Sequence, residues 1–200
     1  GGAFYLGNPA FTIRGCTFTN NLALDDGGVV YSDPAAGSVN VIADSVFVTN
    51  RAIGGTSGTI YAVGTGGTQT YTLTNSTFVA NWAAGSGGGG YIADGDYIYL
   101  YDCRFTNNVS TTGNGGGFLV AGTFISTTVS NCPFVGNRSD GLGGGGYFGN
   151  GTTLSIVNCH LADNFATNLD TSAAETESGG SFYMGSPSFA LLGCTFTNNY

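Results

Sequence analysis

Five cysteines could form disulfides, bind soft metals or act as nucleophiles in this 200-residue chain. They are Cys16, Cys103, Cys132, Cys159 and Cys194. Each stands two residues before a phenylalanine or leucine, and Ser45 and Ser76 hold the equivalent place elsewhere. A place shared by cysteine and serine favours a small core residue, although disulfides between neighbours stay an alternative. Single thiols in a row cannot surround a metal, and we expect the only histidine, His160, to face outward, so we predict no metal and no cofactor.

Carboxylates could hydrolyse a glycoside, which requires two of them about 5 to 10 Å apart. Asp44 and Asp102 hold equivalent places in the repeating pattern but belong to repeats that are two apart, roughly 10 Å by the strand spacing. The acidic pairs at 25–26 and 94–96 are typical of turns. With no lysine and four arginines, the chain also lacks the cationic half of a polysaccharide-cleaving site. We therefore predict no catalytic residues and no enzymatic activity.

Four Asn-x-Ser/Thr sequons could carry N-linked glycans. They begin at Asn75, Asn108, Asn137 and Asn150. Asn108 and Asn137 belong to a column of asparagines that is expected to face inward. Asn75 at a corner and Asn150 in a Gly-Asn-Gly turn are expected to be exposed, so these two are the candidate glycosylation sites.

Aromatic side chains could bind sugars by stacking on their rings. Tyr97, Tyr99 and Tyr101 alternate with Ile98 and Leu100, which predicts an outward row of tyrosines along one strand. Tyrosine also suits any half-exposed strand, so a sugar-binding row and an ordinary strand face are both open.

All of these residues are placed by a repeat that returns seven times. Its anchors, separated by 29, 31, 27, 29, 27 and 35 residues, are Phe18, Phe47, Phe78, Phe105, Phe134, Leu161 and Phe196. Three residues after each anchor stands an asparagine: Asn21, Asn50, Asn81, Asn108, Asn137, Asn164 and Asn199. Three residues before each anchor stands glycine, aspartate or asparagine, the types that accept a left-handed backbone at a corner.

Within each repeat, apolar residues alternate with polar ones, which predicts two or three short strands per repeat. The 36 glycines disfavour helices. Repeats of 27 to 35 residues with strands and corners predict an all-β fold, a right-handed parallel β-helix of about seven rungs. The anchors are expected to stack in the core, and the asparagines to form a ladder of amide hydrogen bonds between rungs.

The composition limits the partners and the location of this chain. Only 8% of the residues are charged and the formal net charge is −8, which argues against binding to nucleic acid or to anionic membranes. No apolar run is long enough for membrane insertion. A surface built from Thr, Ser, Asn and Gly is unusual in the cytosol and indicates an extracellular or cell-surface protein.

The two ends of the chain resemble each other. Residues 179–199 match residues 1–21 at 14 of 21 positions, with an offset of 178 residues. We expect 1–200 to be a single β-helix segment that associates end to end with itself or continues in a longer tandem chain. Both arrangements give a rod, because a bare β-helix end exposes strand edges. The excursion at 165–178 is either a solvated loop or a binding loop.

The chain resembles the repeats of polymorphic outer-membrane proteins, in which Phe-x-x-Asn alternates with Gly-Gly-Ala-Ile motifs. Residues 18–30 and 78–92 show both motifs, and the resemblance covers essentially the whole chain. It departs at Leu161 and at 57–58, where the glycine pair is imperfect. The resemblance implies an extracellular right-handed β-helix used for adhesion or as a surface structure, and it carries no catalytic residues.

The sequence thus favours a structural extracellular protein, a glycosylated β-helical rod, filament or surface stalk. The alternative is an adhesin, or a β-helix that binds or cleaves carbohydrate.

Overall fold

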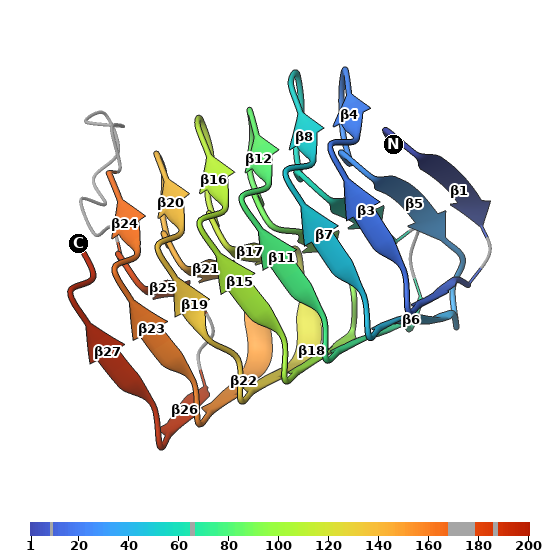
Figure 1. The fold of residues 1–200 in the computed structure, drawn as a ribbon. Helices are drawn as coiled ribbons and strands as arrows, with labels where there is room; N and C mark the ends of the chain where they lie inside the picture. The colour runs from blue at the N-terminus through green and yellow to red at the C-terminus, as the bar shows by residue number, and fades with distance from the viewer. Residues whose placement is uncertain (9, 65–66, 168–178, 186–187) are drawn as a thin grey trace.

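The computed structural model describes residues 1–8, 10–64, 67–167, 179–185 and 188–200. These ranges contain 27 strands, which form four sheets in which every strand pair is parallel (Figure 1). The protein is therefore a parallel β-solenoid, as the repeat predicts. Its first and last strands lie at opposite ends of the solenoid (Figure 1). The part of the chain that the structure describes holds no helix long and apolar enough to cross a membrane.

Sheets A, B and C each contain seven strands. Sheet A consists of β1 (Phe4–Asn8), β5 (Val30–Pro34), β9 (Ile60–Val63), β13 (Tyr91–Ala93), β17 (Phe118–Ala121), β21 (Gly146–Phe148) and β25 (Phe182–Met184). Sheet B consists of β2 (Thr12–Arg14), β6 (Val39–Ala43), β10 (Thr70–Thr74), β14 (Tyr97–Tyr101), β18 (Phe124–Ser130), β22 (Gly151–Val157) and β26 (Phe189–Leu192). Sheet C consists of β3 (Thr17–Thr19), β7 (Val46–Val48), β11 (Thr77–Val79), β15 (Arg104–Thr106), β19 (Phe134–Val135), β23 (His160–Ala162) and β27 (Thr195–Thr197).

Sheet D has six strands of two residues each, so most repeats contribute four strands instead of the two or three predicted. Its strands are β4 (Leu22–Ala23), β8 (Arg51–Ala52), β12 (Trp82–Ala83), β16 (Val109–Ser110), β20 (Arg138–Ser139) and β24 (Phe165–Ala166). We call one strand from each of sheets A, B and C, in chain order, a rung. The predicted excursion at 165–178 falls mainly on residues 168–178, which lie outside the described residues.

A left-handed backbone turns the chain between sheets B and C on every rung. The φ angles there lie between 45° and 63°, at Gly15, Asp44, Asn75, Asp102, Asn131, Asn158 and Gly193. The predicted corner column is thereby confirmed. A further left-handed residue precedes each ladder asparagine, including the β-branched Thr49 with φ 54°.

The imperfect glycine pair at 57–58 still makes the same turn as the others. Ser57 adopts φ 60°, and Gly87 in the next repeat adopts φ 69°. The Ser57 hydroxyl donates a hydrogen bond to the Ile60 carbonyl at 2.7 Å, inside the turn. Serine therefore replaces glycine here because its side chain bonds locally to the backbone.

The predicted anchors form the centre of the core. Ring centroids from Phe47 to Phe78, Phe105 and Phe134 are separated by 4.8, 4.9 and 4.7 Å, with nearly parallel planes. Leu161 is fully buried and ends the continuous ring stack, and Phe134 meets Phe182 from sheet A edge-on instead. The two end anchors differ from the rest of the stack. Phe18 is partly buried and Phe196 is 47% exposed, because the described rungs cover each from one side only.

Candidate functional site

The predicted asparagine ladder runs through all seven repeats. Its members are Asn21, Asn50, Asn81, Asn108, Asn137, Asn164 and Asn199, and the Nδ2 of each of the first six donates to the Oδ1 of the next at 2.8 to 3.0 Å. Each backbone N–H on the first six of these residues donates to the same oxygen, at 2.9 to 3.1 Å. The left-handed residue before each asparagine turns the chain so that the amide points inward.

An inner ladder asparagine uses its whole side-chain amide. The Oδ1 of Asn81 accepts from the backbone and the side chain of Asn50, at 2.9 and 3.0 Å. Its Nδ2 donates to Asn108 Oδ1 and to the Phe47 carbonyl, both at 3.0 Å. Because Asn81 is fully buried, these four bonds are what makes its polar amide tolerable in the core.

The ladder has a direction. Between the side-chain amides, the nitrogen always donates to the oxygen on the rung that follows in the chain, and the oxygen accepts from the rung before. The second Nδ2 hydrogen bond goes to a backbone carbonyl on the rung before. Among the described residues, Asn21 Oδ1 therefore has no donor, and the Asn199 backbone N–H has no acceptor.

A second, weaker ladder follows the cysteine and serine column. The Ser45 hydroxyl donates to Ala43 O at 2.7 Å, and Cys103 Sγ lies 3.4 Å from Tyr101 O in the equivalent bond. The Cys103 backbone N–H donates to Cys132 Sγ at 3.3 Å. All five cysteines are free thiols in this structure. Cys103, Cys132 and Cys159 are buried, as the core interpretation predicts, whereas Cys16 and Cys194 are partly buried.

The environment of the buried thiols suppresses their ionisation. Burial raises the pKa of the Cys159 thiol to about 12. The pKa of Cys132 is also raised, chiefly by its hydrogen bond to Cys103 and then by burial. These sulfurs are therefore protonated at neutral pH, which is not the state of a nucleophile or a metal ligand.

The acidic candidates belong to separate surface contacts. Asp44 accepts from Arg14 at 3.2 Å and from Asn75 at 2.9 Å, and Asp102 accepts from Asn131 at 3.1 Å. Within the ranges that the structure describes, no three His, Cys, Asp or Glu side chains are grouped closely enough to hold a metal ion. The structure does not bring Asp44 and Asp102 together.

The sequons separate as predicted. Asn75 and Asn150 are exposed, and the Asn75 side chain donates to Asp44. Asn108 and Asn137 are fully buried in the ladder, where no glycan could be attached to the folded chain. His160 faces outward, and its Nδ1 lies 2.7 Å from the Thr195 hydroxyl.

The predicted tyrosine row on β14 has the expected alternation. Tyr97, Tyr99 and Tyr101 are half-buried on the outer face, while Ile98 and Leu100 are fully buried. The rings of Tyr99 and Tyr101 lie parallel, with centroids 6.0 Å apart.

A longer tyrosine column, on the outer face of sheet A, was not predicted. The strand register aligns Tyr5, Tyr31, Tyr61, Tyr91, Leu119, Tyr147 and Tyr183. Neighbouring centroids are 5.4, 5.3 and 5.0 Å apart over the first four rings, and 4.8 Å apart for Tyr147 and Tyr183. The sequence holds a signal for this column, because each member stands three residues after the second position of a glycine pair or its equivalent.

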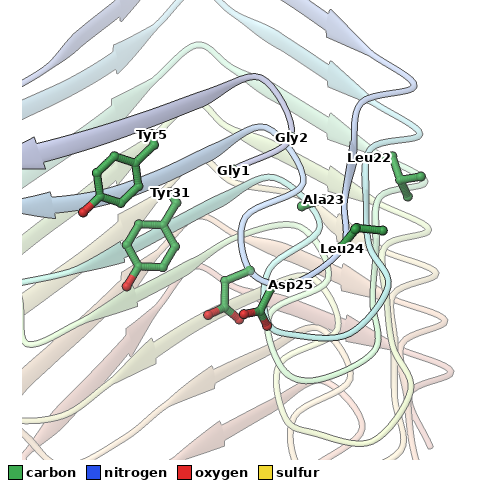
Figure 2. A pocket seen from close by; sticks show the side chains of 9 residues that line it. Gly1, Gly2, Tyr5, Leu22, Ala23, Leu24, Asp25 and Tyr31 are labelled. Carbon is green, nitrogen blue, oxygen red and sulfur yellow. The ribbon is translucent and has the colours of Figure 1, made fainter.

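A hollow of about 540 Å³ lies beside the first rung. Figure 2 shows Tyr5 and Tyr31 next to each other at this site, with Leu22, Leu24 and Asp25 on the neighbouring turn. Asp26 also lines the hollow, but its Oδ1 already accepts from the Thr56 backbone and hydroxyl, both at 2.7 Å. The pKa of Tyr31 is raised, first by burial and then by Asp26, so this phenol stays neutral.

No family model, curated protein or solved structure matches this chain. The two ladders, the tyrosine column and the end rungs are therefore the features on which a proposed function can rest.

Proposed function

We propose that this chain is a structural protein of the extracellular space or cell surface, whose solenoid serves as a rod, a filament unit or a surface stalk. The observation that carries the proposal is the asparagine ladder, which continues through every rung. The ladder keeps the cross-section of the solenoid the same from rung to rung. The sides of the rod remain free for contacts with the surroundings.

The surface chemistry supports a location outside the cytosol. Charged residues make up 8% of the chain and lysine is absent, a composition that is unusual for a cytosolic protein. Asn75 and Asn150 are exposed sequons that could carry N-linked glycans. We include these two glycans, but no metal, cofactor or nucleic-acid partner, in the proposal.

We also propose that this chain belongs to the polymorphic outer-membrane-protein repeat class. The alternation of Phe-x-x-Asn with glycine pairs supports it, although Leu161 replaces the phenylalanine of one repeat and Ser57 the first glycine of another. The asparagines form the ladder, and Gly116 and its equivalents allow close contact between backbones, as the overlap that a Cβ would make with the Arg138 carbonyl demonstrates.

Electron microscopy of the native material tests the rod. We expect elongated particles or filaments whose long axis follows the ladder, with rungs about 4.8 Å apart. Globular particles without an axial repeat would contradict the proposal. Treatment of the native material with a peptide N-glycosidase, followed by mass spectrometry of the peptides around Asn75 and Asn150, tests the glycans.

Carbohydrate binding is a second candidate function, favoured by the tyrosine column on sheet A. The four rings from Tyr5 to Tyr91 have spacings of 5.0 to 5.4 Å, so they offer a continuous aromatic strip along the rod. Aromatic faces and edges of this kind contact the apolar faces of sugar rings.

Binding to a panel of soluble polysaccharides tests this second function. Tyr61→Ala should weaken binding about tenfold if the column on sheet A is used, equivalent to about 1.4 kcal/mol. Tyr99→Ala on sheet B serves as the matched control, and a selective loss there would instead assign the row on β14. No binding by the wild-type chain would reject the carbohydrate function.

A further inference from the structure

We infer that Arg51 and Trp82 on the outer face of sheet D, with Ile53 beside them, bind a carboxylated sugar residue of a glycan. The two residues lie on β8 and β12, and the strands of sheet D follow one edge of the solenoid (Figure 1). This ligand is additional to the rod function, and its site is separate from the tyrosine column on sheet A. Strands β8 and β12 each pair with a described strand on both sides.

Arg51 stacks on the indole ring of Trp82. The strand register places the two residues opposite each other on neighbouring turns, and the guanidinium carbon lies 4.8 Å from the ring centroid. A guanidinium over an aromatic ring is attracted by the negative face of the ring and keeps its N–H donors at its own edge. Arg51 is exposed and Trp82 is half-buried. The stack therefore holds a set of coplanar donors in place at the surface.

Arg51 has no carboxylate partner among the described residues, whereas the equivalent arginine three turns later has one. Arg138 lies over Phe165, with its guanidinium carbon 5.8 Å from the ring centroid, and its Nη2 donates to Asp140 Oδ1 at 2.9 Å. Ile53 holds the place two residues after Arg51 that Asp140 holds after Arg138. One of two equivalent cations is thus neutralised within the chain, and the other keeps its charge for a ligand.

The surroundings of the Arg51 guanidinium offer an apolar contact and a further donor. Ile53 is 42% exposed, although its strand neighbours on both sides are described. The indole N–H of Trp82 has no acceptor among the described residues. A uronic or sialic acid presents matching groups, because it carries a carboxylate and hydroxyl groups on a ring with an apolar C–H face. Such a carboxylate accepts two parallel hydrogen bonds from a guanidinium.

A peptide strand cannot be added to this face. Strand β8 pairs with β4 on one side and with β12 on the other, so neither offers a free edge. The backbone N–H groups of Arg51 and Trp82 each donate to a carbonyl group of the preceding turn at 2.9 Å. Peptides that bind by strand addition depend on free main-chain groups, which are absent from this part of the described chain. Recognition here therefore depends on side chains, which favours a sugar over an extended peptide.

The charge of the surroundings favours a ligand with few carboxylates. The formal net charge of the chain is −8. The carboxylates of Asp25 and Asp26 crowd Gly55, two residues after Ile53, so negative charge stands close to the site. A densely sulfated or carboxylated polymer would be repelled along the rod. One carboxylated sugar in an otherwise neutral glycan gains the contact with Arg51 and avoids this repulsion.

Tryptophan fluorescence measures binding at the site itself, because Trp82 is the only tryptophan of the chain. The probes are sialyllactose and methyl glucuronide, which carry one carboxylate each, and lactose as the neutral control. We expect a saturable change in emission with at least one of the carboxylated sugars, and which of them binds identifies the acid. The response should weaken as salt is added, since the contact is a surface charge pair. A response to lactose of equal affinity would overturn the inference.

A carboxylate without a sugar ring separates the two parts of the proposed ligand. The probe is acetyl-aspartate amide, which carries one carboxylate on a short peptide unit. We expect it to bind at least about tenfold more weakly than the carboxylated sugar, equivalent to about 1.4 kcal/mol, because it has no apolar ring face for Ile53 and Trp82. Equal affinity would overturn the assignment to a sugar.

Substitutions on the two equivalent turns test the role of the free cation. Arg51→Ala should weaken binding of the carboxylated sugar about tenfold or more. Ile53→Asp should do the same, because it gives Arg51 the carboxylate that Arg138 already has. Arg138→Ala is the matched control and should leave binding unchanged. Circular dichroism confirms that each variant is folded before titration.

Ile53→Asn separates charge from shape at the same position. Asparagine resembles aspartate in size but does not neutralise the guanidinium, so this variant should keep more affinity than Ile53→Asp. Equal losses in the two variants would overturn the role of Arg51 as a cation that is free for a ligand.

The outcomes that overturn this site are distinct from those that overturn the other proposals. No change in emission with either carboxylated sugar, and no heat of binding by calorimetry, would reject the site but keep the rod, which electron microscopy tests. Binding that survives Arg51→Ala and is lost in Tyr61→Ala would place the sugar on sheet A and would also reject the site on sheet D.

Discussion

At the scale of single residues, Asn81 should be among the positions most sensitive to substitution. Asn81→Ala leaves the backbone N–H and the Nδ2 of Asn50 without an acceptor in a fully buried position. Because each unsatisfied buried group costs about 1 to 3 kcal/mol, we expect the free energy of unfolding to fall by about 3 kcal/mol. Urea unfolding measures the change. Asn150→Ala, at an exposed turn, should stay within about 0.5 kcal/mol, and equal losses in the two variants would contradict the role of the ladder.

The buried thiols should make the fold sensitive to alkaline pH. The pKa of Cys159 is raised from 9.0 to about 12 and that of Tyr91 from 10.0 to about 12, in both cases chiefly by burial. At a pH between the ordinary pKa and the raised pKa of each group, the unfolded chain has lost a proton that the folded chain keeps. The free energy of unfolding therefore falls as pH rises through this interval. Urea unfolding between about pH 8 and about pH 11 measures the decline.

Cys159→Ser is the control for this pH dependence. Serine does not ionise in this range and already occupies the column at Ser45 and Ser76. The variant should show a shallower loss of stability than the wild-type chain. Stability that is independent of pH over this range would show that the folded thiol and phenol ionise as freely as the unfolded ones.

At the level of single residues, the sequence predicts the ladder well but does not predict the tyrosine column on the outer face of sheet A. The spacing of Asn21 and its equivalents predicts the ladder because a buried amide must be satisfied on every rung. The tyrosine column was missed because its members lie 26 to 36 residues apart and only strand register brings them together. From the sequence, Ser57 is a departure from the glycine-pair motif, because its local hydrogen bond to the Ile60 carbonyl cannot be inferred from composition.

At the scale of the structural elements, the glycines set how closely the sheets approach. A Cβ on Gly116 would overlap the Arg138 carbonyl oxygen of the neighbouring turn and lie 2.5 Å from Gly144 O. Both obstacles are backbone atoms that hydrogen bonding holds in place, so they cannot move aside. We expect Gly116→Ala to lower the free energy of unfolding by about 4 kcal/mol or to prevent folding, as measured by circular dichroism and urea unfolding.

Gly185→Ala is the matched control for that substitution. The nearest atom to its Cβ would be Asn150 Oδ1 at 3.4 Å, which is an ordinary contact. Because alanine lowers the entropy of the unfolded chain, this variant should be neutral or slightly more stable. A comparable loss in both variants would mean that chain entropy, and not close backbone contact, decides the cost.

The strands of sheets B and C could be predicted because apolar and polar residues alternate along them, as in Thr70–Thr74. Sheet D could not be predicted, since a strand of two residues such as Val109–Ser110 has no period to detect. These short strands are determined by the rungs on either side, through bonds such as that from the Val109 N–H to Asn81 O at 2.9 Å. The right-handed sense of the solenoid stays a prediction.

At the scale of the whole molecule, protection from the solvent should vary along the rod. Inner strands such as β14 pair on both sides, whereas β2 and β26 pair on one side only among the described residues. In dilute solution, backbone amides of the middle rungs should therefore exchange hydrogen more slowly than those of the end rungs. Hydrogen exchange read by mass spectrometry measures this gradient, and uniform exchange along the chain would show that it opens as one unit.

The common direction of the ladder amides also gives the rod a net dipole moment along its long axis. An amide group carries a dipole of about 3.5 D, and seven side chains arranged head to tail add their axial components, with the positive end at Asn199. The sum grows with every further unit that keeps the same direction. Rods of this kind should turn in an applied field and show an electric birefringence that increases with their length.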